Sequence, residues 1–278
     1  MSGPVDLHTH TTCSDGTLTP EQLVREAKRL GLVAVGITDH DTLGGVAEAW
    51  RAGDRLGVEV VPGVEISVDP PWGDRELHLL GYYVKENEEL ESKLRWARGA
   101  RERRNLRIIE ELVGLGMDIS YEEVKRLAGG DVVGRPHIAR LLVEKGYVKS
   151  FEEAFLRYLA RGGEAYTPKE RLGAEEGITL ILRSGGVPVW AHPIKSGYDP
   201  SEVEKVLEWL VSKGLRGIEV YTPDHTPKQV EHLKSLAKKR GLIITGGSDY
   251  HGPGKNSHGK LGLNLEVPYE TVLNLKKG

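Results

Sequence analysis

The stretch DLHTHTTCSDG, residues 6–16, holds two histidines two positions apart and an aspartate in a Ser-Asp-Gly turn. The segment that begins at Pro4 starts with apolar residues and continues with polar ones. We therefore interpret residues 4–10 as a strand that ends in polar side chains. Side chains two residues apart on a strand point to the same side. His8 and His10 are therefore expected to present two imidazoles to one point, with Asp15 following closely in the sequence.

Beyond this stretch, short apolar runs alternate with amphipathic segments, which is typical of an α/β fold. In the first helical segment, Thr19 is placed to cap the helix, Pro20 suits its first position, and Gly31 follows its end. The pattern predicts strands at 4–10, 32–40, 58–68, 76–84, 186–192, 215–221 and 242–249, and helices at 19–30, 46–56, 174–183, 201–213 and 228–240. The tail from residue 252 is expected to be rich in loops.

The alternation stops between residues 92 and 171, where helical patterns dominate and strand signals are scarce. This segment contains 17 Lys and Arg against 12 Asp and Glu, whereas the rest of the chain contains 21 against 29. Pattern and charge change together, although a chance drift of charge along the chain is the simpler alternative. We predict a barrel-forming body made of residues 1–91 and 172–278, with a basic helical insertion domain at 92–171 that caps the site.

The composition excludes several classes of protein. One cysteine, Cys13, in 278 residues excludes a disulfide framework and a cysteine-based zinc finger. No run approaches the ~20 apolar residues of a spanning helix, and the first residues lack a signal-peptide pattern, so a cytoplasmic protein with no membrane partner is expected. The formal net charge of −3 argues against an extended face for duplex nucleic acid.

Histidine and acidic side chains recur in or near the ends of the predicted strands. They are His8, His10, Asp15, His40, Glu65, His78, His192, Asp249 and His251. Taken alone, each is more often a hydrogen-bonded core or turn residue, but strand ends meet on one face of an α/β barrel. Clustered carboxylates repel one another unless cations compensate them, and imidazole with carboxylate suits Zn, Fe or Mn. The pattern therefore predicts two or three divalent metal ions.

The segments DLHTHTTCSDG, GITDHDT, PGVEI, AHP and TGGSDYH occur in this order and closely resemble the motifs of the PHP (polymerase and histidinol phosphatase) family. The resemblance implies a distorted barrel of seven strands and seven helices, with the metals at the carboxyl ends of the strands. It also implies three ligand sets: His8, His10, Glu65 and Asp249; His78 and His192 with Glu65 shared; and Asp15, His40 and His251. Water activated by the metals would attack phosphorus, so His8, His10, Glu65 and Asp249 would be catalytic.

The segment from GRPHIARLL to EAYTPK, which starts at Gly134, is similar to the helical insertion of the nucleotide-phosphatase branch of this family. That branch acts on nucleoside 3′,5′-bisphosphates and on short 5′-phosphorylated oligonucleotides. The resemblance implies an enzyme that removes the 3′-phosphate of such bisphosphates. Two alternatives stay open: a 5′→3′ exoribonuclease on short RNA, and a metal-binding PHP module without catalysis. The expected partner is a small nucleotide or short oligonucleotide, bound by a monomer or small homo-oligomer.

Four residues are predicted to bind a substrate phosphate. Arg135 can grip phosphate oxygens with its planar guanidinium, and His137 can donate a hydrogen bond, although a surface Arg and a capping His are the alternative. Arg101 and Arg104 would hold a phosphate if they turn toward the barrel, whereas an Arg-rich helix face is usually only solvated. His137 or His225 is a candidate for protonating the leaving group, and the sequence does not choose between them.

Overall fold

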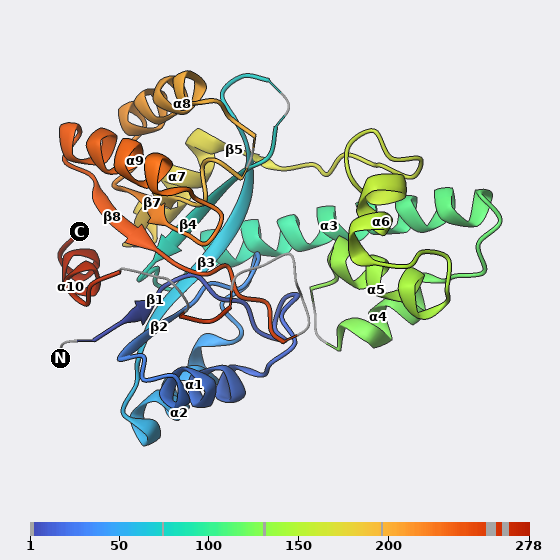
Figure 1. Ribbon diagram of the computed structural model, residues 1–278, viewed down its shortest axis with the longest axis horizontal. Helices are drawn as coiled ribbons and strands as arrows, with labels where there is room; N and C mark the ends of the chain where they lie inside the picture. Colours follow the sequence, from blue (N-terminus) through green and yellow to red (C-terminus); the bar gives the residue numbers. More distant parts are fainter. Residues whose placement is uncertain (1–2, 74, 130–131, 196, 254–259, 263–266) are drawn as a thin grey trace.

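The computed structural model describes residues 3–73, 75–129, 132–195, 197–253, 260–262 and 267–278. Within these residues, one mixed sheet has the order β1-β2-β3-β4-β6-β7-β8, and a short strand β5 pairs with β3 (Figure 1). The strands are β1 (Val5–Asp6), β2 (Ala34–Ile37), β3 (Glu59–Asp69), β4 (Leu77–Tyr82), β5 (Leu172–Gly173), β6 (Val187–Trp190), β7 (Gly217–Tyr221) and β8 (Ile243–Gly246). The helices beside the sheet are α1 (Pro20–Arg29), α2 (Val46–Leu56), α7 (Ala174–Arg183), α8 (Pro200–Ser212), α9 (Pro227–Lys239) and α10 (Glu270–Lys277).

The sheet curls until its two edge strands meet. The Leu7 amide donates to the Gly246 carbonyl at 3.2 Å, and Thr9 forms an isolated parallel bridge with Tyr250. Buried apolar faces of the surrounding helices pack on the outside of the strands, as the shared clusters of α1 and α2 with β2 show. The predicted α/β barrel with distorted closure is confirmed.

Strand β4 explains how a histidine near the start of a strand joins a site formed mainly at the carboxyl ends of strands. It pairs antiparallel with both β3 and β6, while the other neighbours on the main path of the sheet pair in parallel. The amino end of β4 therefore lies where the parallel strands have their carboxyl ends. His78 is the second residue of β4 and faces Ser67 in the β3–β4 register, so it reaches the same end of the barrel as the other histidines.

Local sequence signals explain most element boundaries. Thr19 caps α1 in a reciprocal capping box with Gln22, Pro20 is the first helical residue, and Gly31 adopts a φ of 76°, as expected. Three elements differ from expectation, of which the first is the short strand β5, which was not predicted. Strand β1 contains only two residues, so His8 and His10 lie beyond it, on either side of the Thr9 bridge. Helix α10 was expected to be loop, because its eight residues give too short a helical period to recognise.

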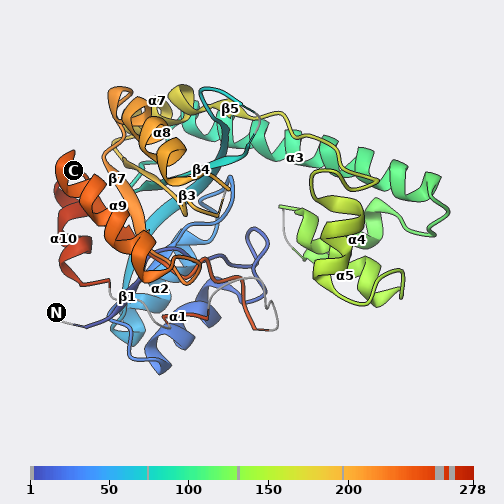
Figure 2. The same ribbon diagram turned by 45° about the horizontal axis from the view of Figure 1, so that its top comes forward.

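The segment between β4 and β5 is helical, and it is carried by one long helix, α3 (Glu88–Gly114). Helices α4 (Tyr121–Ala128), α5 (Arg135–Glu144) and α6 (Phe151–Ala154), with the π-helix η1 (Phe155–Leu159), gather around its far half (Figures 1 and 2). Leu90 and Leu94 of α3 belong to the barrel core, whereas Ile108 and Leu112 belong to a separate insertion core. The domain boundaries at 92 and 171 stay a prediction, and the first of them falls inside α3.

No helix in the described part of the chain is long and apolar enough to cross a membrane.

Candidate functional site

Glu65, in the middle of β3, lies at the centre of five histidines. Its Oε2 atom is 3.3 Å from His8 Nε2, 3.1 Å from His10 Nε2 and 3.1 Å from His40 Nδ1. Its Oε1 atom is 2.7 Å from His78 Nδ1 and 3.0 Å from His192 Nε2. A carboxylate offers about four lone-pair directions, so it cannot serve five imidazoles at once with good geometry.

All nine histidine and acidic residues singled out in the sequence lie at this end of the barrel. Their nitrogen and oxygen atoms form three groups in which the candidate ligand atoms lie within 4.8 Å of one another. The groups are His8, His10, Glu65 and Asp249; Glu65, His78 and His192; and His10, Asp15, His40 and His251. Glu65 and His10 are each shared by two groups. The structure thus brings together the sets that the family resemblance implies, with His10 as an addition to the third.

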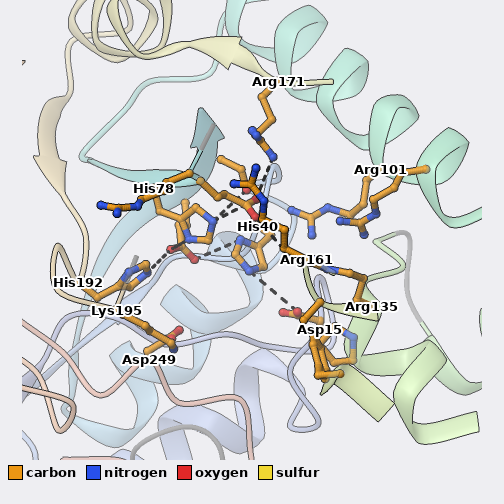
Figure 3. A pocket seen from close by; sticks show the side chains of 18 of the residues that line it. Asp15, His40, His78, Arg101, Arg135, Arg161, Arg171, His192, Lys195 and Asp249 are labelled. Carbon is orange, nitrogen blue, oxygen red and sulfur yellow. Dashed lines mark hydrogen bonds and ion pairs between the residues drawn. The ribbon is translucent and has the colours of Figure 1, made fainter. Parts of the chain in front are cut away.

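The backbone at two of these residues adopts a conformation that is costly for side-chain-bearing residues. His192, after β6, has a φ of 27°, and Asp249, after β8, has a φ of 53°. Non-glycine residues with positive φ cost about 1–3 kcal/mol each and persist where the surroundings hold them in place. Both side chains are directed into the cluster by these turns (Figure 3).

The chemistry of the donor atoms fits divalent cations. His8 Nε2, His10 Nε2 and His40 Nδ1 are buried and make no hydrogen bond. Leaving such an atom unsatisfied costs about 1–3 kcal/mol, and a ligated cation would remove that cost. Burial by itself lowers the pKa of His78, but the charge of Glu65 raises it to about 9. The raised pKa of His78 reflects the negative charge around it, and the same negative charge attracts metal ions.

A cavity of about 490 Å³ opens over the cluster and extends to the helical insertion (Figure 3). Glu65, His78 and His192 line one end of it. The remaining lining residues include Arg75, Glu76, Arg101, Arg104, Arg135, Pro136, Phe155, Ala160, Arg161, Tyr166, Arg171 and Lys195. One cavity therefore joins a metal-type cluster to a group of cationic side chains.

The three predicted phosphate-binding arginines line this cavity but differ in what holds them. Arg101 donates through Nε and Nη2 to Asp41 Oδ2, at 3.2 and 2.8 Å. Arg135 donates to the Leu159 carbonyl at 3.2 Å, and its Nη2 lies 3.5 Å from Glu76 Oε2. Arg104 donates only to the amide oxygen of its neighbour Asn105, and within the described residues it forms no ion pair. Of the three, Arg104 is the one whose charge lacks a carboxylate in contact.

Arg104 is also buried, with 5% of its surface exposed. Burial, together with the charges of Arg135 and Arg101, lowers its pKa well below the usual value. An arginine does not give up its proton in a protein, so the shift means that the folded chain carries an electrostatic cost there. An anion in the cavity would remove that cost.

The model of the PHP domain matches residues 6–165 of the chain. The protein belongs to the PHP family. A relative in Haemophilus influenzae, a 5′-3′ exoribonuclease, is 34% identical over 268 residues, which is 96% of each chain. Another, a 3′,5′-nucleoside bisphosphate phosphatase of Chromobacterium violaceum, is 31% identical over 90% of this chain and 88% of its own.

A solved structure from Bifidobacterium adolescentis, assigned as a metal-dependent phosphoesterase, superposes with a TM-score of 0.89 at 34% identity. The match covers 98% of this chain and 96% of the other. The PHP fold and the predicted branch of the family are thereby confirmed. This PHP protein is a metal-dependent phosphoesterase, a hydrolase that acts on phosphoric ester bonds, rather than a binding module without catalysis.

One buried residue of the PHP site was missed by sequence reasoning. Glu219, on β7, accepts from His8 Nδ1 at 3.1 Å and from the backbone amide of His192 at 2.8 Å. Because a carboxylate can only accept, the His8 proton is held on Nδ1, and Nε2 points its lone pair into the cluster. The available signal was a glutamate inside the apolar run GIEVY, where an unpaired charge is costly.

The two histidines proposed as proton donors lie outside the lining of the PHP cavity. His137 accepts from the Gly134 amide through Nδ1 at 3.0 Å, so it caps α5, which was the alternative considered for it. His225 donates through Nδ1 to the Val220 carbonyl at 2.8 Å, and burial lowers its pKa. Neutral His225 therefore presents a lone pair at Nε2, which suits accepting a proton better than donating one.

Proposed function

We propose that this PHP enzyme hydrolyses the 3′-phosphate of nucleoside 3′,5′-bisphosphates with two or three divalent ions drawn from Mn, Fe and Zn. The observation that carries the proposal is the single cavity with the three ligand groups at one end and buried, uncompensated Arg104 at the other. A substrate with two phosphates on one nucleoside can occupy both ends at once.

At the barrel end, the nine residues of the three ligand groups hold the metal ions. When bound, the ions supply an activated water and neutralise charge on the phosphate under attack. Glu219 keeps His8 in the tautomer that can ligate, and it places the His192 backbone at the same time. Glu65 joins two groups, so it sets the distance between the sites they form.

At the insertion end, Arg104 and Arg135 hold the 5′-phosphate. Arg104 has no carboxylate in contact, and Arg135 is oriented by its bond to the Leu159 carbonyl and by its ion pair with Glu76. Arg101 contributes charge while it stays paired with Asp41. Holding one phosphate fixes the nucleoside, so the other phosphate is positioned without further loss of freedom. His137 caps the start of α5, the helix that carries Arg135.

A second candidate function is the 5′→3′ exoribonuclease activity on short 5′-phosphorylated RNA. The relative of H. influenzae with that activity covers 96% of this chain. A first internucleotide link stands in the same place as a 3′-phosphate relative to a held 5′-phosphate, so one cavity can serve both reactions.

A substrate panel tests the proposal. Purified protein of known metal content, measured by elemental analysis, is given adenosine 3′,5′-bisphosphate, 5′- and 3′-monophosphates, and 5′-phosphorylated RNA and DNA of two to five nucleotides. We expect the bisphosphate to have the highest kcat/KM, at least about 10-fold above either monophosphate, because loss of one charged contact costs about that much. Equal rates on monophosphates and the bisphosphate would contradict the proposal, and higher rates on the oligonucleotides would favour the second candidate.

A further inference from the structure

Lys195 is a cation of the cavity that the reaction above does not use. It follows β6, three residues after His192, and lines the cavity. Its Nζ atom is 2.5 Å from Asp249 Oδ2 and 3.9 Å from Asp224 Oδ2. Two thirds of its side chain is covered, and the exposed third faces the space above the cluster. The ammonium group is therefore fixed at the edge of the ligand groups.

Asp249 stands between Lys195 and the histidines. Its Oδ1 atom lies 3.2 Å from His10 Nε2 and 3.6 Å from His8 Nε2, while Oδ2 contacts Lys195. Figure 3 shows Lys195, His192 and Asp249 on one side of the site, and Arg101, Arg135 and Arg161 on the other. In the proposed function the reacting phosphate binds over the ligand groups, between Lys195 and these arginines.

This separation determines which part of a substrate Lys195 can meet. A nucleoside held by Arg104 and Arg135 lies on the insertion side, so the ester bond to be broken points toward the insertion. The other oxygens of the reacting phosphate then point away from the nucleoside, toward Lys195. In a bisphosphate these oxygens are terminal and carry close to two charges at neutral pH. In an oligonucleotide one of them is esterified to the next nucleotide, and the group carries one charge.

We infer that Lys195 is a specificity-determining residue that favours phosphate monoesters over diesters by donating a charge-assisted hydrogen bond to a terminal phosphate oxygen. The inference rests on the proposed orientation of the nucleoside. A monoester offers this oxygen with its full charge, and such bonds are roughly twice as strong as neutral ones. A diester replaces the oxygen with an ester link, and its next nucleotide must also pass the ammonium group. The side chain at position 195 therefore determines whether the enzyme prefers phosphatase or exonuclease substrates.

The test compares monoester and diester substrates in Lys195→Met. The first pair is adenosine 3′,5′-bisphosphate and a 5′-phosphorylated diadenosine dinucleotide. The second is p-nitrophenyl phosphate and methyl p-nitrophenyl phosphate, which share a leaving group and need no nucleoside site. We expect kcat/KM of the monoesters to fall by about 10- to 100-fold and that of the diesters by less than about 3-fold, because only the monoesters lose a charged bond.

Two further variants isolate the charge. Lys195→Arg keeps a cation and is expected to retain most of the monoester preference. Lys213→Met is the matched control, because Lys213 is 30% exposed and pairs with one carboxylate, Glu175, but does not line the cavity. Metal content is measured for every variant, since Lys195 also contacts Asp249.

A parallel loss on monoesters and diesters would mean that Lys195 only positions Asp249, and it would overturn the inference. An unchanged ratio would overturn it as well. If wild-type protein fails to hydrolyse the bisphosphate, the proposed function fails, and the p-nitrophenyl pair still decides the role of Lys195.

Discussion

The two ends of the cavity differ in how their charges are balanced. At the barrel end, each acidic group faces imidazoles, and Glu65 alone contacts five of them at 2.7 to 3.3 Å. At the insertion end, Arg104 is buried next to Arg101 and Arg135 with no carboxylate in contact within the described residues. The charges of the barrel end suit cations, and those of the insertion end suit an anion. The two ends are therefore complementary to ligands of opposite charge.

The difference also concerns the backbone. The barrel residues follow or lie within strands whose register is fixed by the sheet, and two of them are held at positive φ. The arginines project from α3 and from the first turn of α5, where side-chain direction depends on the rotation of a helix. Metal geometry tolerates little error, whereas a phosphate can be reached by long, flexible cations.

The strongest test of the barrel end is Asp249→Ala. We expect kcat/KM to fall by about 10³-fold or more, because the variant removes a ligand from a group whose other members cannot replace it. Thermal unfolding should stay cooperative. Asp54→Ala, an exposed change on α2, is the control. Phosphatase activity that survives Asp249→Ala undiminished would disprove the assignment of this cluster as the reactive centre.

The corresponding test of the insertion end is Arg104→Met. We expect KM for the bisphosphate to rise by about 100-fold with metal content unchanged, because a charged contact to the 5′-phosphate is lost. The free energy of unfolding should rise by about 1 kcal/mol, since a buried cation without a partner is removed. Arg103→Met is the control, because Arg103 is half exposed and pairs with Glu170. A fall in stability together with an unchanged KM would show that Arg104 is structural.

Glu219→Gln probes whether the barrel end is preorganised. Glutamine keeps the size of the side chain but weakens the orientation of His8 and of the His192 amide, so metal affinity should fall by about 10-fold. Competition with a graded series of chelators measures this without any turnover. The affinity of the same variant for inorganic phosphate at saturating metal should stay within about 2-fold of wild type. Unchanged retention of metal would show that the histidines are positioned by the sheet alone.

Lys169 is a buried lysine whose Nζ lies 4.0 Å from Asp41 Oδ2, the atom that Arg101 also contacts. It provides the smallest test of positive charge beside the insertion end. Burial and the charge of Arg101 lower its pKa to about 7. An unfolded lysine titrates near 10.4, so between about pH 7 and 10 the unfolded chain binds more protons and stability rises with pH. Below pH 7 both states hold the proton, and the cost of the buried charge is present in full.

We therefore expect the stability of wild type relative to Lys169→Met to increase by up to about 1 kcal/mol per pH unit above pH 7. Denaturant unfolding of both proteins from pH 6.5 to 9.5 measures this difference in stability. The contributions of the other titrating groups are common to both proteins and cancel. A flat difference over this range would mean that Lys169 keeps its proton in the folded chain.

The comparison also marks what the sequence can predict. The recurrence of His, Asp and Glu in or near strand ends, together with the family resemblance, was sufficient for the barrel and for the nine clustered residues. Alternation on a strand did not bring His8 and His10 together, because both lie beyond the short β1. The antiparallel β4 was not foreseen, since apolar runs carry no direction, and His78 was placed in the cluster without that knowledge. The role of Glu219 was also beyond reach, because its partner His8 lies 211 residues away in the sequence.

At the insertion end, the sequence predicted which arginines belong to the site but not which acidic groups they pair with. Arg101, Arg104 and Arg135 were named, yet nothing in the order of residues shows that Asp41 pairs with Arg101 and leaves Arg104 without an acid. The capping bond of His137 was weighed only as an alternative, and the cavity lining excludes both His137 and His225. The metal-ligand and phosphate-binding roles themselves stay predictions until the variants above are measured.

Helix α3 has one further consequence. Its first turns are anchored in the barrel core and its last turns in the insertion core, with Arg101 and Arg104 between them. Each residue of an α-helix advances the rotation by about 100°. A single inserted or deleted residue before Arg101 would turn both arginines away from the cavity and rotate the whole insertion with them. The protein can therefore vary the length of this helix only in steps close to whole turns. A helix with a fixed rotation between its two anchored ends keeps the two ends of the cavity aligned.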